Sequence, residues 1–200
     1  MKKFTLEIVA FFCGAVVMAF EIVGSRMLGP YVGTSMFAWT SIIGVILLSL
    51  SIGYFWGGRI ADMRPRADIL SLFIFISALF IIITLVVKES VLEILLGSID
   101  NIHIVSVIAS LVLFAIPSIL LGMVSPFAVR IKMKSLEKSG STVGNLYAIS
   151  TVGSIVGVFL AGFLLIPTFK ITNILMLLAI VLISVSIFLN GVYLYIHHKN

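Results

Sequence analysis

Glu21 is an acidic residue deep inside the first apolar stretch of this 200-residue chain, and its type and position suit the binding of a proton or a cation. Glu21 follows a long apolar run, and an ionised carboxylate inside a bilayer costs about 2.5 kcal/mol or more. Such a group can bind a proton or an organic cation, with Arg26 and Tyr54 as further candidates for the same site. The structural alternative is a fixed partner, either an ion pair with Arg26 or a hydrogen bond from Tyr54. Both interpretations stay open.

A second group of charged residues follows the second apolar stretch. Asp62 is an acid in a basic segment that begins with Gly58 and ends with Arg66. It can cap the following turn, or pair with Arg66 or with Arg130 further along the chain. A charge relay of this kind can hold one conformation of a transporter as a latch, whereas the alternative is a solvated loop that includes an aspartate. The spacing favours the latch.

These residues lie within or between apolar stretches that are long enough to cross a bilayer. A hydrocarbon core about 30 Å thick needs roughly 20 apolar residues of helix. The composition, 61% hydrophobic and 10% charged, leaves too few polar residues for a water-soluble surface. We therefore predict an all-α integral membrane protein, one domain over residues 1–200, with six transmembrane helices at roughly 5–28, 35–58, 69–87, 102–127, 143–166 and 171–195.

The distribution of lysine and arginine predicts the orientation. Short loops rich in these residues stay on the cytoplasmic side. The cations on one predicted side are Lys2, Lys3, Arg59, Arg64, Arg66, Arg130, Lys132, Lys134, Lys138 and Lys199. The other side has Lys88 and Lys170, and Arg26 lies at the outer end of the first span. Both termini are then cytoplasmic, in a multi-pass protein of the cell (inner or plasma) membrane. The cations also favour membrane lipids as partners, and their scatter over short loops argues against nucleic acid.

Local patterns predict irregular features within this bundle. Residues 88–101 alternate apolar and acidic residues at helical spacing, which predicts a short amphipathic helix on the outer surface. Pro117 and Pro126 predict a kinked or broken fourth helix, with neighbouring helices satisfying the freed carbonyls. Gly153, Gly157 and Ala161 form a small-residue ridge suited to close helix packing, within the bundle or in a dimer. No cluster of histidine and cysteine indicates a metal or another cofactor.

Two short segments resemble each other. Residues 27–31 read Met-Leu-Gly-Pro-Tyr and residues 123–127 read Met-Val-Ser-Pro-Phe, while Gly53-Tyr54-Phe55 is echoed by Gly157-Val158-Phe159. Three spans reverse the direction of the chain, so the echoes predict an inverted three-plus-three repeat with halves at roughly 5–87 and 102–195, as in many secondary transporters. The alternative is chance similarity in a restricted alphabet.

Several motifs together carry a family resemblance. Gly58, Asp62 and Arg66 resemble the signature loop of major facilitator transporters, with Pro65 where a glycine is usual. The ordered set over roughly residues 20–167 resembles the membrane region of fused facilitator/spermidine-synthase-like proteins: Glu21-x-x-x-Ser25-Arg26-Met27-Leu28-x-Pro30-Tyr31, Gly53-Tyr54-x-x-Gly57-Gly58-Arg59, Pro117-x-x-Leu120-Leu121-Gly122-Met123-x-x-Pro126, Gly144-Asn145-Leu146-Tyr147-Ala148 and Gly162-Phe163-x-Leu165-x-Pro167. The resemblance implies a facilitator-like half. In the fused proteins an aminopropyltransferase-like domain follows, and no residue of this chain is assigned that chemistry.

Three functions follow as expectations. The first is a half-size transporter that acts as a homodimer on a small, polyamine-like organic cation or a proton-coupled solute. The second is a non-catalytic membrane partner of a separate, soluble aminopropyltransferase-like protein. The third is a structural assembly subunit, in which Glu21 serves packing. In none of them is the chain itself an enzyme.

Overall fold

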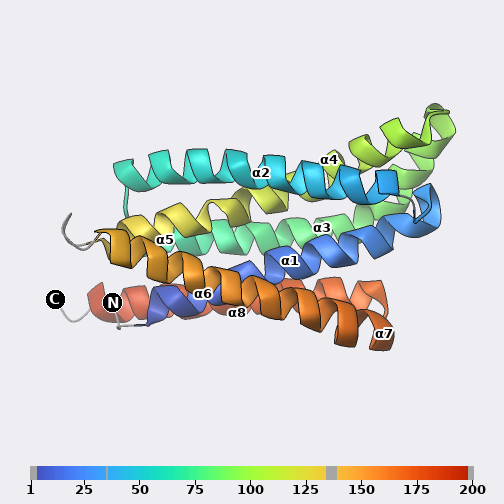
Figure 1. The fold of residues 1–200 in the computed structure, drawn as a ribbon. Helices are drawn as coiled ribbons and strands as arrows, with labels where there is room; N and C mark the ends of the chain where they lie inside the picture. Colours follow the sequence, from blue (N-terminus) through green and yellow to red (C-terminus); the bar gives the residue numbers. More distant parts are fainter. Residues whose placement is uncertain (1–3, 35, 134–138, 198–200) are drawn as a thin grey trace.

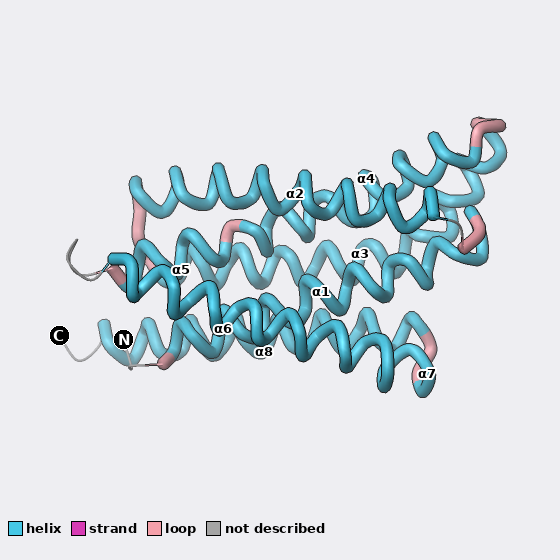
Figure 2. The backbone as a smooth tube through the Cα atoms, viewed as in Figure 1, coloured by secondary structure: helices cyan, strands magenta, loops and turns pink. Residues whose placement is uncertain are grey.

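The computed structural model describes residues 4–34, 36–133 and 139–197, and these form helices joined by short connections (Figures 1 and 2). The flanking cations Lys2, Lys3, Lys134, Lys138 and Lys199 lie outside the described residues. In chain order the elements are α1 (Thr5–Val32), α2 (Met36–Met63), α3 (Ala67–Ser98), α4 (Ile102–Gly122), α5 (Val124–Lys132), α6 (Ser139–Phe159), the π-helix η1 (Leu160–Leu165), α7 (Ile166–Thr168) and α8 (Ile171–His197).

The predicted all-helical fold with six long apolar helices is confirmed. Within the described residues, six helical spans are long and apolar enough to cross a membrane, with α4 and α5 forming the fourth span and α6, η1 and α7 the fifth. The start of α1 and the end of α8 lie at the same end of the bundle (Figure 1). We call this the terminal end. The connection after α2 and the end of α5 also lie there.

The predicted separate helix over residues 88–101 is wrong. Residues 88–98 continue α3, which runs unbroken from Ala67 to Ser98. The reason is local: no proline or glycine interrupts the chain before Gly97, and Leu92 is fully buried, so the apolar packing of α3 continues past the charges. A 32-residue helix is about 48 Å long, well beyond a hydrocarbon core of about 30 Å.

The predicted break in the fourth span is confirmed, and it falls at Met123 between the two prolines. Met123 forms a turn between α4 and α5, drawn as a loop segment in Figure 2. Pro117 lies inside α4 and cannot donate to the carbonyl of Leu113 four residues earlier. The Thr84 hydroxyl of α3 donates to this carbonyl at 2.7 Å, so a neighbouring helix satisfies it as predicted.

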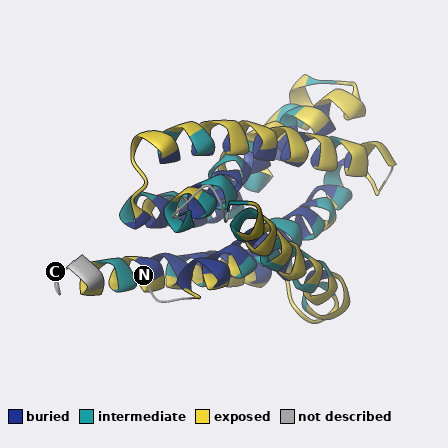
Figure 3. Cartoon of the chain, turned by 60° about the vertical axis from the view of Figure 1, so that its left-hand side comes forward, coloured by how far each residue is buried: buried dark blue, intermediate teal, exposed yellow. Residues whose placement is uncertain are grey.

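Helix packing follows a simple pattern. The most extensive contacts join α1 to α6, α2 to α4, and α3 to α8, while α3 with α4 and α1 with α8 complete the bundle. Buried residues line the sides on which the helices meet (Figure 3). At the centre, Phe20 of α1 meets Phe114 of α4 edge to face, with ring centroids 5.1 Å apart. The other long helices thus pack around the central helices α1 and α4.

Glycines set the closest helix approaches. Gly53 of α2 lies against the α4 backbone at Ile119, and Gly57 lies against the turn at Met123, where a side-chain carbon at Gly57 would be 2.6 Å from the Cα of Met123. The small-residue ridge of α6 does the same within the bundle. Gly153 and Gly157 lie against the backbone of α1. Ala161, in η1, is fully buried. Because α1 covers this ridge, the ridge does not face a partner chain.

Candidate functional site

Glu21 lies near the middle of α1 and is buried, with 8% of its surface exposed. The helix extends to Val32, so the carboxylate is closer to the helix midpoint than the predicted span implied. Among the described residues, Glu21 makes no hydrogen bond or ion pair. It is therefore a buried carboxylate without a fixed partner in this part of the chain.

The neighbours of Glu21 define the direction in which it points. Gly14, two turns earlier on the same side of α1, contacts Ser150 and Ser154 of α6, and the Ser154 hydroxyl donates to the Gly14 carbonyl at 3.2 Å. Gly24, on the other side of Glu21, contacts the ring of Phe114 in α4. With about 100° per residue, Glu21 lies between the α6-facing and α4-facing sides of α1.

The two predicted companions of Glu21 are not bonded to it. Arg26 is exposed, and the structure places no described ion pair between it and Glu21. Tyr54 is 45% exposed on α2. Within the described residues, neither of the two fixed partners considered for Glu21 is therefore bonded to it.

On α2 and on α6, one exposed or partly exposed face is made largely of small and polar residues. On α2 the face consists of Thr40, Gly44, Leu47, Ser51, Tyr54 and Gly58, spaced three or four residues apart. On α6 it consists of Gly144, Tyr147, Ala148, Thr151, Ser154 and Ile155. We call these the polar faces of α2 and α6. Each lies beside a second exposed face of the same helix that carries large apolar residues, including Leu48 and Phe55 on α2 and Val152 and Phe159 on α6.

The polar faces meet at the terminal end, where Gly58 of α2 and Tyr147 of α6 line the same pocket. This pocket has a volume of about 300 Å³. It lies between α2, α5 and α6 and is lined by Gly58, Asp62, Pro126, Val129, Arg130, Met133, Val143 and Tyr147. Ser154, at the edge of the α6 face, also touches α1 beside Gly14. The polar face of α6 thus reaches α1 two turns before Glu21.

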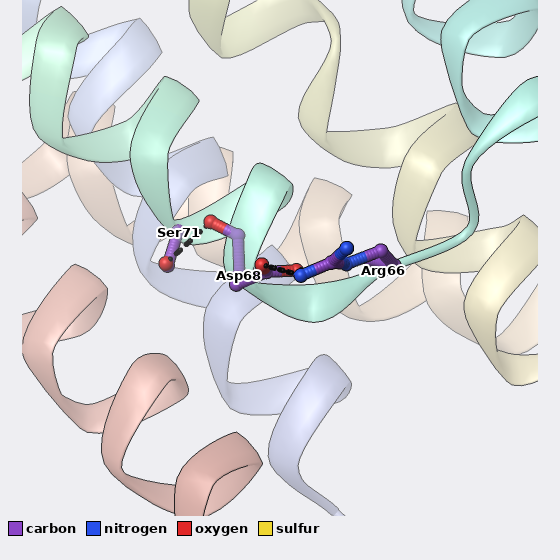
Figure 4. Close-up of polar contacts among 3 residues, drawn as sticks. All are labelled: Arg66, Asp68 and Ser71. Carbon is purple, nitrogen blue, oxygen red and sulfur yellow. Dashed lines mark hydrogen bonds and ion pairs between the residues drawn. The ribbon is translucent and has the colours of Figure 1, made fainter.

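The four predicted latch residues are divided between two contacts. Arg130 of α5 pairs with Asp62 of α2, with Nε 2.8 Å from Oδ1, and Gly58 lies beside Pro126 in the same pocket. Arg66 does not join this pair. It binds Asp68 instead, two residues along the chain (Figure 4). Both side chains of the Asp62–Arg130 pair are substantially exposed, at 72% and 42%.

A second ion pair of α5 was not predicted from the sequence. Lys132 pairs with Glu7 of α1, and the Glu7 side chain is only 8% exposed. The sequence shows an acid, Glu7, in the first turns of an apolar helix, but the lysine that pairs with it lies 125 residues further along the chain. Since Arg130 and Lys132 belong to the same short helix, α5 is tied to α2 and to α1 at the terminal end.

No group of three or more histidine, cysteine, aspartate or glutamate side chains in the described part of the chain is placed to hold a metal ion. Cys13 is buried and unpaired. No protein-family model, curated protein or solved structure matches the chain.

Proposed function

We propose that the chain is a half-size membrane transporter module that pairs with a second copy of itself and carries a small organic cation or a proton-coupled solute. The observation that carries the proposal is the pair of polar faces on α2 and α6, together with the buried Glu21 of α1, the helix that packs against α6. Exposed glycines and hydroxyl residues contact lipid poorly but suit close helix packing or a water-filled pathway. A second copy that covered these faces would enclose a polar pathway beside Glu21.

The composition of the two faces makes a partner more favourable than lipid. Large apolar residues already cover the neighbouring exposed faces of α2 and α6, and these faces suit acyl chains. Gly44 and Gly144 instead leave their backbone open, with no described atom within 4 Å of the point where a side-chain carbon would lie. A two-fold axis along the membrane normal would bring the polar face of α2 against that of α6 in the partner, as in transporters built from two six-span halves.

The position of Glu21 supports a cationic or proton-coupled solute. Transporter binding sites lie near the bilayer midplane, and Glu21 lies near the middle of α1. Its carboxylate has no competing partner among the described residues. A cation or a proton would offset the cost of burying its charge. A polyamine-like substrate belongs to this class.

The order of helix contacts supports an inverted three-plus-three repeat. In such a repeat the first, second and third spans correspond to the fourth, fifth and sixth. The contact between α1 and α6 then corresponds to the contact between α4 and α2, and the contact between α3 and α8 corresponds to itself. The registers of the two contacts differ. Gly53 meets Ile119, whereas Gly157 meets Ala15. If residues 27–31 correspond to residues 123–127, then Ile119 corresponds to Val23, and Gly157 should meet Val23 rather than Ala15. Val23 lies two turns further along α1 than Ala15, so the order of the helices supports the repeat, whereas the register of the short echoes does not match it.

The terminal-end ion pairs support the proposed latch. Asp62–Arg130 and Glu7–Lys132 join α5 to α2 and to α1, and α5 begins at the break at Met123. A short helix that pivots at this break would have to break both pairs to open the terminal end. In the proposed orientation, with both chain termini in the cytoplasm, this is the cytoplasmic gate.

Two experiments test the proposal. The mass of the purified complex in nanodiscs should equal two chains, and a stoichiometric soluble aminopropyltransferase-like protein in the complex would instead favour the partner-subunit alternative. In proteoliposomes, Glu21→Gln should abolish the uptake of polyamine-like cations, while the exposed Glu93→Gln on α3 should leave uptake unchanged. A monomeric complex, or unaltered uptake by Glu21→Gln, would contradict the proposal.

A further inference from the structure

The fifth span is not a regular α-helix along its whole length. At η1 the Ile166 N–H donates to the carbonyl of Ala161, five residues earlier, whereas an α-helix joins residues four apart. Such π segments are rare and often occur at functional sites. The short helix α7, which directly follows η1, lies at the end of the bundle opposite to the terminal end (Figure 1). The span therefore contains one extra residue in a wide turn near that end.

Pro167 accounts for the wide turn. Proline has no N–H group, and in an α-helix its ring would meet the carbonyl of the residue four positions earlier, here Phe163. The wider turn takes this carbonyl out of that position. Hydrogen bonding stays irregular up to the end of the span, where the Thr168 hydroxyl donates to the carbonyls of Leu164 and Leu165. Removing the proline would therefore remove the reason for the π form.

The burial of side chains follows the wide turn. Ala161 is fully buried, and the next residues that pack against the core are Leu165 and Ile166, four and five positions later. In an α-helix the same side would hold Leu164 and Leu165, three and four positions later. Leu164 is 52% exposed in this structure. A change from the π form to an α-helix would thus exchange Ile166 for Leu164, two side chains of equal size, on the side that faces the bundle.

The two sides of η1 are held differently. Before it, Gly153 and Gly157 lie so close to α1 that a side-chain carbon at either position would overlap a carbonyl oxygen, that of Phe11 or that of Ala15. After it, α7 packs mainly against η1 itself, and a short exposed connection joins α7 to α8. A return to an α-helix would therefore leave α6 in place and turn α7 by one residue, or roughly 100°.

The wide turn lies at the level of Glu21. Both α1 and α6 run away from the terminal end, and Gly157 of α6 meets Ala15 of α1 (Figure 1). The next turn of each helix brings Ala161 to the level of Ala19, two residues before Glu21. Helix α1 also packs against η1. The side chains that a change of register would exchange therefore lie beside the part of α1 that carries the buried carboxylate.

We propose that η1 is a register switch of the fifth span, with the π form of this structure and a second, α-helical form in which Leu164 replaces Ile166 on the side that faces the bundle. The two forms bury side chains of equal size, so Pro167 sets the balance in favour of the π form. The rotation of α7 gates the pathway beside Glu21 at the end opposite to the terminal end, where α5 is the gate. This gating role rests on the proposed transport function, whereas the switch itself does not.

Nitroxide spin labels report the register directly, because oxygen dissolved among acyl chains reaches a lipid-facing label more readily than a packed one. The label is attached to Leu164→Cys or to Ile166→Cys in the full chain in nanodiscs, with Cys13 replaced by alanine. Without further changes, the label at position 164 should be the more accessible to oxygen, and Pro167→Ala should reverse this order. Pro117→Ala, which removes the proline inside α4, should preserve the order. An unchanged order in Pro167→Ala, or a reversal in Pro117→Ala, would overturn the switch.

Deletion of Gly162 separates the switch from the fold. It removes the extra residue of the wide turn, so a regular α-helix then places Leu165 and Ile166 on the same side as in the π form. This variant should keep the thermal stability of the wild-type protein in nanodiscs. Deletion of Ile155 should instead lower stability strongly, because it breaks the spacing of the two ridge glycines that lie against α1. Equal damage by the two deletions would overturn the switch.

Uptake in proteoliposomes tests the gating role separately. The folded variant without Gly162 is held in one register and should lose the uptake of polyamine-like cations. Normal uptake by this variant would overturn the gating role, and the oxygen measurement would still decide whether the register changes. Absence of uptake by the wild-type protein would overturn the proposed function, and the gating role with it.

Discussion

Replacing Gly53 by alanine adds one methyl group at the closest approach of α2 to α4. The new carbon would overlap the carbonyl oxygen of Ile119 and lie 2.9 Å from the Cα of Gly122. Comfortable carbon–carbon contacts begin at about 3.5 Å. The helices must therefore separate by roughly 0.6 Å or more at this point, and the obstructing atoms belong to backbone that cannot rotate away.

The expected cost is a balance of two effects. Inserting a methyl group into a packed interface costs about 1–3 kcal/mol. Alanine recovers roughly 0.5–1 kcal/mol through its better helix propensity. Gly53→Ala should therefore lower the free energy of unfolding by about 1–2 kcal/mol. Gly44→Ala, in the same helix with open space around it, should be neutral or slightly stabilising.

The assay is unfolding in mixed micelles of a mild detergent and sodium dodecyl sulfate, followed by circular dichroism at a concentration that keeps the chain monomeric. The difference between Gly53→Ala and Gly44→Ala removes the contribution of helix propensity. Equal stability of the two variants would refute the close packing of α2 against α4.

The remaining stability predictions concern polar contacts. Thr84→Val removes the hydrogen bond to the Leu113 carbonyl beside Pro117 and should cost about 1 kcal/mol in the same assay. Lys132→Met leaves Glu7 buried without its partner and should cost about 2 kcal/mol, whereas Arg130→Met breaks an exposed pair and should cost roughly 0.5 kcal/mol.

Matched comparisons check these values. Thr151 hydrogen-bonds only within its own helix and is exposed, so Thr151→Val should change stability by less than Thr84→Val does. For the ion pairs, adding Glu7→Gln to Lys132→Met should restore part of the lost stability, because the unpaired charge is then gone. An equal cost for Lys132→Met and Arg130→Met would contradict the difference in burial.

The sequence predicted the parts of the fold that depend on local chemistry. Bilayer thickness and apolar length identify the six spans, and two prolines identify the break near Met123. The separate helix at residues 88–101 was wrong because charge alone does not end a helix. Lys88 and Glu89 pair with each other, and the backbone of α3 continues beneath them. A helix end needs a residue that interrupts backbone hydrogen bonding.

The site was less predictable because it depends on contacts between distant segments. Asp62 had Arg66 and Arg130 as possible partners, and only the packing of α5 against α2 favours Arg130. The Glu7–Lys132 pair has no sequence signal beyond an acid in an apolar helix. In the same way, the ridge at Gly153 predicted close packing without identifying α1 as the partner.

Cross-linking in native membranes tests the central claim, that a second copy covers the polar faces of α2 and α6, most directly. A single cysteine is placed at Ser51, on the polar face of α2, or at Leu48, on its apolar face, with Cys13 replaced by alanine. A bifunctional maleimide should link Ser51→Cys into dimers and leave Leu48→Cys monomeric. Dimers from Leu48→Cys but not from Ser51→Cys, or from neither, would contradict the paired half-transporter.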